Sequence, residues 1–457
     1  MGSYTNFLKS KSQFSNDSGF KSLYIPDFLF DFQKYLVDWS VKKGRNAIFA
    51  DCGMGKTIMQ LVWAENIIRK TNKNILIMTP LAVSHQTLRE AEKFGIECKR
   101  SDNGNISSKI TITNYERVHY FNTNDFIGVV CDESSILKNF NGTRKRIITE
   151  FLRTRPYRLL GTATAAPNDY IELGTTSEAL GELGYMDMLN RFFKNDQSTS
   201  GTKRQWSVNG GSAPKWRFKK HAQSSFWQWV SSWAKALRNP SDLGFNDTDF
   251  KLPELLEKQT IIDNQKPLPG ELFVRPAFGL KEQREELKIT LQERCEKAAE
   301  QVDNTHPVIL WCNLNAEGDL LEKLIPDATQ VSGSDSDEKK EKKLLGFSTG
   351  ENRILITKPK IGGFGMNWQH CHKVSFFPTH SFEQYYQAVR RCWRFGQKSN
   401  VVVNIITTKG NLNVLNNLKR KAKAADNMFT QLISFMNNPI KLNIEKYNKK
   451  MEVPSWL

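Results

Sequence analysis

Ten short apolar runs, arranged in two series of five, are the feature that most limits how this chain can fold. The first series is 46–50, 74–79, 110–115, 127–131 and 157–161, and the second is 308–312, 328–332, 353–357, 373–377 and 401–407. Helical stretches separate the runs within each series. Because strands that alternate with helices are typical of a parallel sheet covered on both faces, the pattern predicts two α/β lobes in tandem.

The two series also predict where the parts of the chain begin and end. In order, we expect a flexible arm at 1–22, a first lobe at 23–185, a basic aromatic insertion at 186–262, a linker with a helix at 263–306, a second lobe at 307–436 and a tail at 437–457. The two lobes carry the alternating pattern, so each should bury a core of its own.

The stretch between the lobes has an unusual composition. Residues 191–240 hold ten Lys or Arg against one acid, and five of the chain's 11 tryptophans. Within it, KWRFKK at 215–220 predicts a strand whose basic side would carry Lys215, Arg217 and Lys219. Such a face could follow the phosphates of a nucleic acid, although lysine-rich runs are also often simply solvated. Both interpretations stay open at this point.

The next segment, FWQWVSSWAKAL at 226–237, has the period of a helix. One stripe of this helix would carry Phe226, Val230, Trp233 and Leu237. We interpret the stripe as core packing rather than as a platform on which bases stack.

The charge of the chain favours a polyanionic partner. Lys and Arg number 65 against 48 Asp and Glu, which gives a formal net charge of +17 and a pI near 9.4. Nucleic acid is the first candidate and an anionic membrane surface the second. No apolar run approaches 18 residues and the N-terminus is polar, so we expect neither a membrane span nor a secretory signal.

The seven cysteines are scattered and show no CxxC spacing. This pattern favours a reduced, cytosolic setting and argues against a zinc site. His370, Cys371 and His372 look like ligands, but neighbouring residues on a strand point to opposite faces, and no second cluster supplies the remaining ligands. We therefore expect no metal at these three residues and a cytoplasmic protein.

A phosphate-binding loop is predicted at 50–57, which reads ADCGMGKT. It follows an apolar strand and opens a helix, although an alanine stands where GxxxxGK[ST] has its first glycine. Gly53 and Gly55 would let backbone amides approach phosphate oxygens. Lys56 would reach the β- and γ-phosphates of a nucleotide and Thr57 would hold magnesium. The alternative is a plain glycine turn between a strand and a helix.

Two further elements complete this predicted site in the first lobe. The apolar strand at 127–131 ends in Asp132 and Glu133, at the sheet edge where open α/β sheets bind ligands. Asp132 would hold magnesium, and Glu133 would orient or deprotonate the attacking water. Gln33 lies 23 residues before Lys56, and its amide offers the donor and acceptor that adenine's edge requires.

A pair of arginines near the end of the chain points to a second half of the site. The segment QAVRRCWRFGQ at 387–397 places Arg391 and Arg394 three residues apart, so a helix would carry both guanidinium groups on one face. Because the phosphate-binding loop belongs to the other lobe, we expect a divided site that is complete only when the lobes close.

These motifs stand in an order that resembles the superfamily 2 helicases. The segments that carry the resemblance are Gln33, ADCGMGKT, TPLAVSHQ (79–86), DESS (132–135), GTATAAPND (161–169), TKPKIGGFGMNW (357–368) and QAVRRCWRFGQ. The last two look most like the Swi/Snf-type branch, and the combination resembles short DEAD/DEAH-type helicases of phages and prophages. The similarity covers nearly the whole chain and implies two RecA-like lobes with ATP and Mg²⁺ as cofactors. DESS in place of DEAH or DEAD, and Ala165 in place of proline, are the two departures.

The resemblance implies a role for each matching residue. The catalytic residues would be Lys56, Asp132, Glu133, Arg391 and Arg394; the nucleotide contacts would be Gln33, Gly53, Gly55, Lys56, Thr57, Gly365 and Gln387; the magnesium ligands would be Thr57 and Asp132. The nucleic-acid contacts would be Thr79, Pro80, Asn114, Tyr115, Thr357 and Lys360, with Gly363 and Gly365 in the same second-lobe segment. Thr162 and Thr164 would couple hydrolysis to motion.

The sequence therefore predicts an ATP-dependent DNA translocase or helicase, a hydrolase that acts on duplex DNA in preference to single strands. An RNA helicase is the alternative within the same class. An ATPase switch subunit of a restriction, modification or other DNA-processing complex is the alternative from another class. We expect a cytoplasmic location, in the host cell if the chain is phage-encoded, and a possible protein partner in phage replication, repair or DNA modification.

Overall fold

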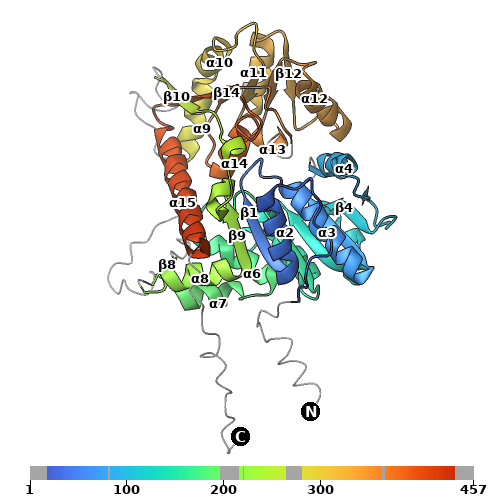
Figure 1. Cartoon of the computed structure of the whole chain (residues 1–457). Coiled ribbons are helices and arrows are strands. Elements are labelled where there is room, and N and C mark those ends of the chain that lie inside the picture. The colour runs from blue at the N-terminus through green and yellow to red at the C-terminus, as the bar shows by residue number, and fades with distance from the viewer. Residues whose placement is uncertain are drawn as a thin grey trace, which may run out of the picture.

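The computed structural model describes residues 18–80, 83–195, 216–219, 221–263, 280–362 and 366–437. Most of the predicted arm, nearly all of the predicted tail and the first part of the predicted linker lie outside these ranges. The described chain forms two α/β lobes, which lie one above the other in Figure 1.

The first lobe is built on a parallel sheet of seven strands. Their order across the sheet is β3 (Lys99–Arg100), β4 (Ile110–Asn114), β2 (Asn74–Thr79), β5 (Phe126–Asp132), β6 (Tyr157–Gly161), β1 (Arg45–Ala50) and β9 (Ala234–Leu237). Every neighbouring pair is parallel. The five strands predicted for this lobe are confirmed, and β3 and β9 are additional.

The second lobe is built on a parallel sheet of six strands. Their order is β10 (Leu255–Ile262), β15 (Val401–Thr408), β14 (Lys373–Phe376), β11 (Val308–Trp311), β13 (Ile354–Thr357) and β12 (Ala328–Val331). All of these pairs are parallel as well. The predicted fold class, two α/β lobes with parallel sheets, is confirmed.

Helices cover both faces of each sheet. In the first lobe they are α2 (Asp31–Lys43), α3 (Lys56–Thr71), α4 (Ser84–Lys93), α5 (Thr143–Leu152), α6 (Leu173–Leu180), α7 (Tyr185–Phe192) and α8 (Gln223–Trp233). In the second lobe they are α9 (Leu280–Ile289), α10 (Leu291–Ala299), α11 (Asn315–Leu324), α12 (Asp337–Thr349), α13 (Pro359–Gly362), α14 (Phe382–Val389) and α15 (Leu412–Asn437).

Each sheet divides its lobe into two cores. In β2, Ile75 and Ile77 join the core under α2, α3 and α4, whereas Leu76 and Met78 join the core under α5 to α8. This assignment follows from the strand period of two, which sends successive side chains to opposite faces. A strand covered on both faces must be apolar throughout, and for that reason these strands appear in the sequence as continuous apolar runs.

The described residues of the predicted insertion at 186–262 include strands of both lobes, because β9 joins the first sheet and β10 joins the second. Helix α8 ends at Trp233, the backbone becomes extended at Ala234, and the chain continues as β9 beside β1. Leu237 therefore lies on a strand and not on the predicted helical stripe. The other three residues of that stripe, Phe226, Val230 and Trp233, are fully buried in the core of the first lobe, so core packing is confirmed for them.

The last helix, α15, belongs to both lobes. Its beginning contributes Leu415 to a core of the second lobe, and its end contributes Met428 and Leu432 to a core of the first. Figure 1 shows it, in red, running along the side of the molecule from one lobe to the other. The helix therefore joins the lobes by packing as well as by covalent connection.

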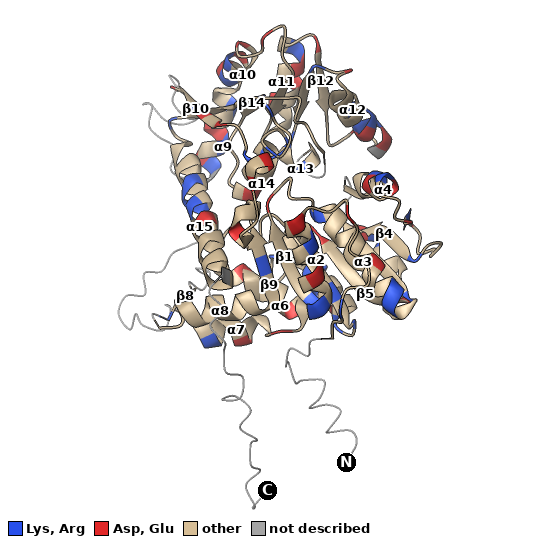
Figure 2. Cartoon of the chain, in the orientation of Figure 1, with Lys and Arg blue, Asp and Glu red and all other residues tan. Residues whose placement is uncertain are grey.

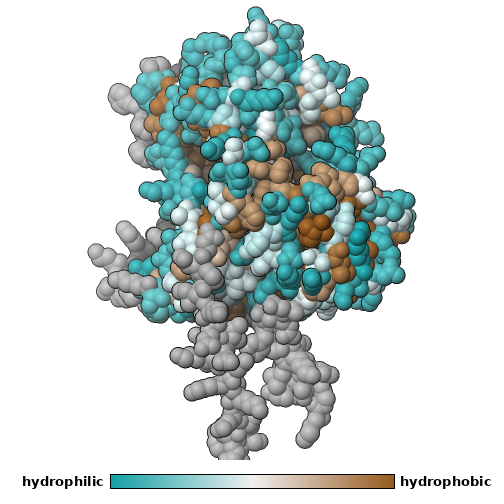
Figure 3. All heavy atoms as spheres, viewed as in Figure 1, coloured by the Kyte–Doolittle hydropathy of each residue, from teal (hydrophilic) through white to brown (hydrophobic). Residues whose placement is uncertain are grey.

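The surface shown in Figure 3 is mostly hydrophilic, and apolar atoms gather near the junction of the lobes. Within the described part of the chain, no helix combines the length and the apolar character that crossing a membrane requires.

Candidate nucleotide site and interlobe cavity

The predicted phosphate-binding loop connects β1 to α3 in a conformation that glycine allows. Gly53 and Gly55 have φ angles of 90° and 74°, in the left-handed region that side chains with a Cβ atom rarely adopt. Helix α3 begins at Lys56, whose ammonium group donates hydrogen bonds to the carbonyl oxygens of Ala50 at 2.9 Å and Asp51 at 3.4 Å. A helix N-terminus behind a glycine loop offers amide donors and a positive dipole end to an anion.

The two predicted carboxylates lie at the same edge of the sheet. Asp132 is the last residue of β5, and Glu133 follows it with a left-handed φ of 51°. Gln60 of α3 donates a hydrogen bond to Asp132 Oδ1 at 2.8 Å, a contact that the sequence analysis missed. Burial, together with the charge of Glu133, raises the pKa of Asp132 to about 6, although Gln60 and the charge of Lys56 act in the opposite direction.

This environment suits a cation. Asp132 is 4% exposed and carries an oxygen ligand whose ionised form is penalised by burial, so a bound cation would stabilise it. Thr57 lies in the first turn of α3 and carries a second oxygen. One carboxylate and a hydroxyl, completed by phosphate oxygens and water, form the kind of ligand set that Mg²⁺ takes in nucleotide sites.

Thr162 and Thr164 lie between this carboxylate pair and the second lobe. Thr162 Oγ1 donates to Glu133 Oε2 at 3.3 Å, and the amide of Thr164 donates to Thr162 Oγ1 at 3.0 Å. The hydroxyl of Thr164 then reaches Glu383 Oε1 of α14 at 3.4 Å. The predicted coupling segment thus forms a chain of contacts from Glu133 to the other lobe.

Gln33 holds the phosphate-binding loop in this conformation. Its side-chain amide donates to the carbonyl of Met54 at 3.0 Å and accepts from the amide of Phe30 at 3.1 Å, and the residue is 4% exposed. Both polar atoms of Gln33 are therefore engaged by backbone, so its predicted contact with adenine stays a prediction.

Aromatic rings from three parts of the chain meet beside the loop. The rings of Phe250 and Phe395 stack at 4.7 Å, and Phe30 packs against Phe250 at 5.0 Å. The backbone of Phe395 lies so close to Gly53 that a Cβ atom there would stand 2.9 Å from the Phe395 nitrogen. These rings were not among the sequence candidates, because aromatic residues distant in sequence give no local pattern.

The two predicted arginines do not share a helix face, which is a correction. Helix α14 ends at Val389, and the chain continues in turns to Gly396, whose φ is 91°. Arg391 Nη1 donates to the carbonyl of Met366 at 3.1 Å, within its own lobe. Burial lowers the pKa of Arg394, and the backbone of the next residue, Phe395, lies against Gly53 of the phosphate-binding loop.

The other predicted second-lobe residues are divided between buried, exposed and undescribed positions. Gln387 is 2% exposed. Thr357 is also 2% exposed and donates to the carbonyl of Val331 at 3.2 Å, so its side chain faces the sheet and not a nucleic acid. Lys360 is exposed on α13. Gly363 and Gly365 lie outside the described residues.

Three of the four first-lobe residues predicted to contact nucleic acid are buried, which is a second correction. Thr79, Asn114 and Tyr115 are no more than 2% exposed, and the Tyr115 hydroxyl donates to the carbonyl of Asp132 at 2.6 Å. They end inner strands of the sheet or follow them directly, so their side chains support the carboxylate edge from within. Pro80 alone of the four reaches the cavity between the lobes.

That cavity has a volume of about 570 Å³ and is lined from both lobes. Helix α4 of the first lobe and helices α12 and α13 of the second contribute to its lining, and Figure 1 shows α4 below α12 at the junction of the lobes. The basic residues that line it are Arg89, Arg100, Lys138, Arg144, Lys340 and Lys360, with Glu133 and Glu383 among the acids. Most of these basic residues were missed, because they are spread over elements that only the fold brings together.

The predicted basic face at 215–220 is described only in part. Strand β8 (Trp216–Phe218) forms as predicted and pairs antiparallel with β7 (Phe193–Asn195). Arg217 is exposed, whereas the ammonium group of Lys219 donates to the carbonyls of Asn190 at 2.6 Å and Arg191 at 3.2 Å near the end of α7. Lys215 lies outside the described residues. Lys219 therefore contacts its own chain.

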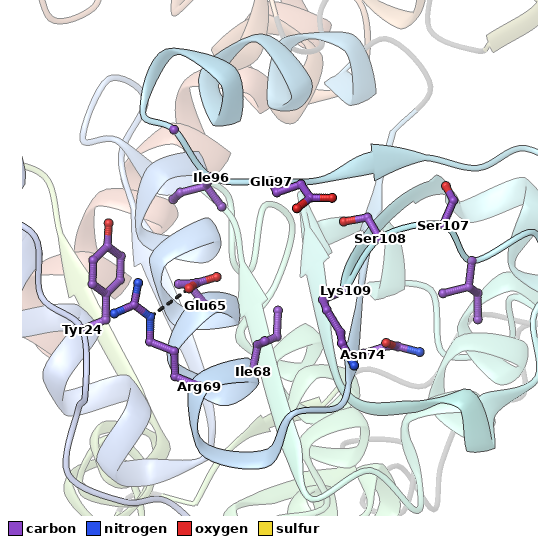
Figure 4. Close-up of a pocket in the computed structure, with 12 residues that line it drawn as sticks. Tyr24, Glu65, Ile68, Arg69, Asn74, Ile96, Glu97, Ser107, Ser108 and Lys109 are labelled. Atoms are coloured by element: carbon purple, nitrogen blue, oxygen red, sulfur yellow. Dashed lines mark hydrogen bonds and ion pairs between the residues drawn. The ribbon is translucent and has the colours of Figure 1, made fainter.

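A second cavity, of about 620 Å³, lies at the opposite edge of the first sheet. Figure 4 shows Glu65 and Arg69 of α3 pointing toward each other beside Tyr24, with Asn74 and Lys109 further along the wall. Asn74 begins β2 and Lys109 precedes β4, so this cavity faces the amino ends of the strands. Because the motifs lie at the carboxyl ends, it is separate from the candidate site.

Sequence comparison finds similarity to curated proteins that share one name. No protein-family model matches the chain. The chain is 26% identical over 225 residues to "DNA annealing helicase and endonuclease ZRANB3" of Bos taurus, covering 43% of this chain and 21% of that protein. It is 25% identical over 206 residues to the Mus musculus protein of the same name, covering 40% of this chain and 19% of the relative.

One solved structure covers almost the whole chain. The "Sulfolobus solfataricus SWI2/SNF2 ATPase core in complex with dsDNA" aligns with 95% of this chain and 100% of its own, at a TM-score of 0.42 and 15% sequence identity. The chain spans about a fifth of the length of the curated relatives that it matches. The sequence similarity to those relatives therefore concerns a part of each protein.

Proposed function

We propose that this protein is an ATP-dependent motor on DNA, a translocase or helicase that hydrolyses ATP between its two lobes. The observation that carries the proposal is a set of neighbouring residues across the junction. Lys56 begins α3, Gln60 of the same helix donates a hydrogen bond to Asp132, and Asp132 adjoins Glu133. From the second lobe, the backbone of Phe395, the residue after Arg394, lies against Gly53 of the phosphate-binding loop. This arrangement supports a site in which groups that would hold phosphate, cation and attacking water lie next to the second-lobe segment that carries Arg394.

In this proposal each group has a distinct task. Lys56 and the amides around Gly53 and Gly55 hold the phosphates, and Thr57 and Asp132 hold the cation. Magnesium, when bound, neutralises charge on the β- and γ-phosphates. The contact of Thr162 supports orientation of the Glu133 carboxylate, which would position or deprotonate the water.

The arginines of the second lobe would make ATP hydrolysis depend on closure of the two lobes. A guanidinium near the γ-phosphate stabilises the charge that develops during transfer, an effect of roughly 10³–10⁵ in rate in related enzymes. Because Arg391 and Arg394 belong to the second lobe, their arrival would require the lobes to approach. The rate of ATP hydrolysis would then depend on the ligand that binds across both lobes and brings them together.

DNA is the proposed ligand of the interlobe cavity. The cavity carries basic residues from both lobes, the chain has a net charge of +17, and the named relatives are DNA helicases. Figure 2 shows Lys and Arg on α12 and α15 as well. A duplex is the proposed substrate, because the resemblance to the Swi/Snf-type branch implies it.

One experiment tests the proposal. We would measure the steady-state ATPase rate with duplex DNA, single-stranded DNA, RNA and no nucleic acid, at one salt concentration, because phosphate contacts make binding strongly salt-dependent. We expect the largest stimulation with duplex DNA. Stimulation by RNA alone would contradict the DNA assignment. If ATP turnover requires Lys56 but no nucleic acid stimulates it, the proposed DNA motor would be wrong and an ATPase switch would be favoured.

A further inference from the structure

Helix α14 meets the first lobe with a charged group at each end. At its start, Glu383 forms an ion pair with Lys138 and accepts from the hydroxyl of Thr164. After its last turn, Arg390 forms an ion pair with Asp51, and the hydroxyl of Tyr386 also donates to Asp51. The helix lies at the junction of the two lobes (Figure 1). The second of these contacts reaches the phosphate-binding loop itself.

Asp51 is part of that loop and is almost completely buried. It is 3% exposed, and its amide donates to the carbonyl of Leu237 on β9 at 3.0 Å. Its carboxylate also accepts from the amide of Cys52 at 2.6 Å. Its own carbonyl accepts from Met54 at 3.3 Å and from the ammonium group of Lys56 at 3.4 Å. A shift of Asp51 would therefore move the residues that would hold phosphate.

Contacts with Trp393 hold the side chain of Arg390 in the orientation in which it pairs with Asp51. It is 7% exposed, its guanidinium carbon lies 4.5 Å from the centre of the Trp393 ring, and Nη1 donates to the Trp393 carbonyl at 3.1 Å. The indole of Trp393 in turn donates to the carbonyl of Pro253 at 2.7 Å. A buried arginine and a buried aspartate are each tolerated when they pair, and removing one leaves the other as an uncompensated charge.

We propose that Arg390 and Tyr386 are positioning residues that hold the two lobes together and set the phosphate-binding loop through Asp51. This inference rests on the proposed ATPase function. Arg390 differs from Arg391 and Arg394, for which a role at the nucleotide is proposed, because its guanidinium pairs with a carboxylate of the loop. The second lobe thus acts on ATP binding as well as on the chemical step.

A double-mutant cycle tests the pair. Asp51→Asn, Arg390→Gln and the double variant would be compared by kcat and KM for ATP at saturating DNA. Arg390→Gln should raise KM about tenfold or more, and the double variant should lose less than the product of the two single losses, because contacting partners are energetically coupled. Unchanged KM in Arg390→Gln, or strictly multiplicative losses, would overturn the inference. Lys297→Gln, which removes an exposed lysine paired with Glu300, is the matched control.

Two further measurements test the inference separately from the double-mutant cycle. Tyr386→Phe removes one hydroxyl and should raise KM by about 2- to 10-fold without affecting folding. Small-angle X-ray scattering of the whole nucleotide-free chain should show a larger radius of gyration for Arg390→Gln than for the wild type and Lys297→Gln. Equal radii would contradict the inference even if the protein hydrolyses no ATP. Absence of turnover in the wild type would instead contradict the proposed function.

Discussion

The nucleotide side and the cavity side of the interlobe junction are built differently. Lys56, Asp132 and Glu133 lie at the carboxyl edge of one sheet, held by short contacts to backbone, Gln60 and Thr162. The cavity side instead presents Arg89 and Lys360 as exposed residues on helices of different lobes. The nucleotide side is a fixed constellation, meaning a few buried or half-buried side chains held in place by hydrogen bonds. The cavity side is a distributed charge, meaning exposed basic side chains spread over several helices. Single substitutions should therefore have very different effects on the two sides.

The largest expected effect comes from Lys56→Ala. We expect ATP turnover to fall at least about 10²–10³-fold, as when an enzyme loses a group that stabilises developing charge. Thermal unfolding should stay near that of the wild type, because the ammonium group contacts only carbonyls of its own loop. Lys70→Ala, an exposed lysine in the last turn of the same helix, is the control and should retain full turnover. If Lys56→Ala retains ATP turnover, Lys56 does not hold the phosphates, and the proposed nucleotide site would be wrong.

The next effect belongs to Glu133→Gln. The substitution keeps the shape and the contact with Thr162 but removes the base, so kcat should fall about 10²–10⁴-fold. ATP binding, measured by calorimetry, should change little. A variant that loses binding and turnover equally would show that Glu133 holds the nucleotide or its cation and does not act on water.

Asp132→Asn should change stability in a direction that depends on pH. The pKa of Asp132 is about 6 in the folded protein against an ordinary 3.8, so the folded state binds more protons between these values and loses stability as pH rises through them. Above pH 6 the asparagine variant should be more stable than the wild type by about 1–3 kcal/mol, at about 1.4 kcal/mol per pKa unit. Below pH 4 the gain should vanish.

Urea unfolding at pH 4 and pH 7.5, without nucleotide or magnesium, measures this difference. Asp249→Asn, which changes an exposed carboxylate, is the control, and its free energy of unfolding should match that of the wild type at each of the two pH values. If Asp132→Asn were destabilised at pH 7.5, the carboxylate would already be stabilised by the protein alone. Asp132 would then need no bound cation to stabilise its ionised form.

The smallest effect is expected on the cavity side, from Lys360→Gln. Loss of one phosphate contact should weaken DNA binding several-fold at all sequences and reduce the slope of log K against log salt by about 1. Thr357→Val, a buried neighbour on β13, should leave both quantities unchanged. A large, salt-independent loss at Lys360 would show that the cavity side is also a fixed constellation.

Strands and the motifs at their ends could be predicted because they are local patterns. All ten apolar runs form strands, and nine of them are inner strands, which are largely apolar because the sheet is covered on both faces; the tenth, β12, lies at an edge. Strand β9 was missed because its sequence, AKAL, suits a helix and is extended only through pairing with β1. The centre of β10 is polar, Glu257 to Gln259, which is compatible with an edge strand but resembles a loop.

The contacts across the junction could not be predicted, because they join residues far apart in sequence. Asp51 and Arg390 lie inside the motifs at 50–57 and 387–397, but neither occupies a position to which those motifs assign a role, and the two are neighbours only in the folded chain. The arginine pair was placed on a helix because three-residue spacing fits one, yet α14 ends before both. Sequence order likewise gave no sign that Tyr115 turns inward to Asp132.

The central claim is that a guanidinium of the second lobe completes an ATP site of the first. Single-turnover hydrolysis of ATP bound to the wild type and to Arg394→Ala, with duplex DNA present, tests it most directly. We expect equal amounts of bound ATP in the two proteins and a hydrolysis rate about 10³-fold lower in the variant. Equal rates of hydrolysis in the two proteins would contradict it.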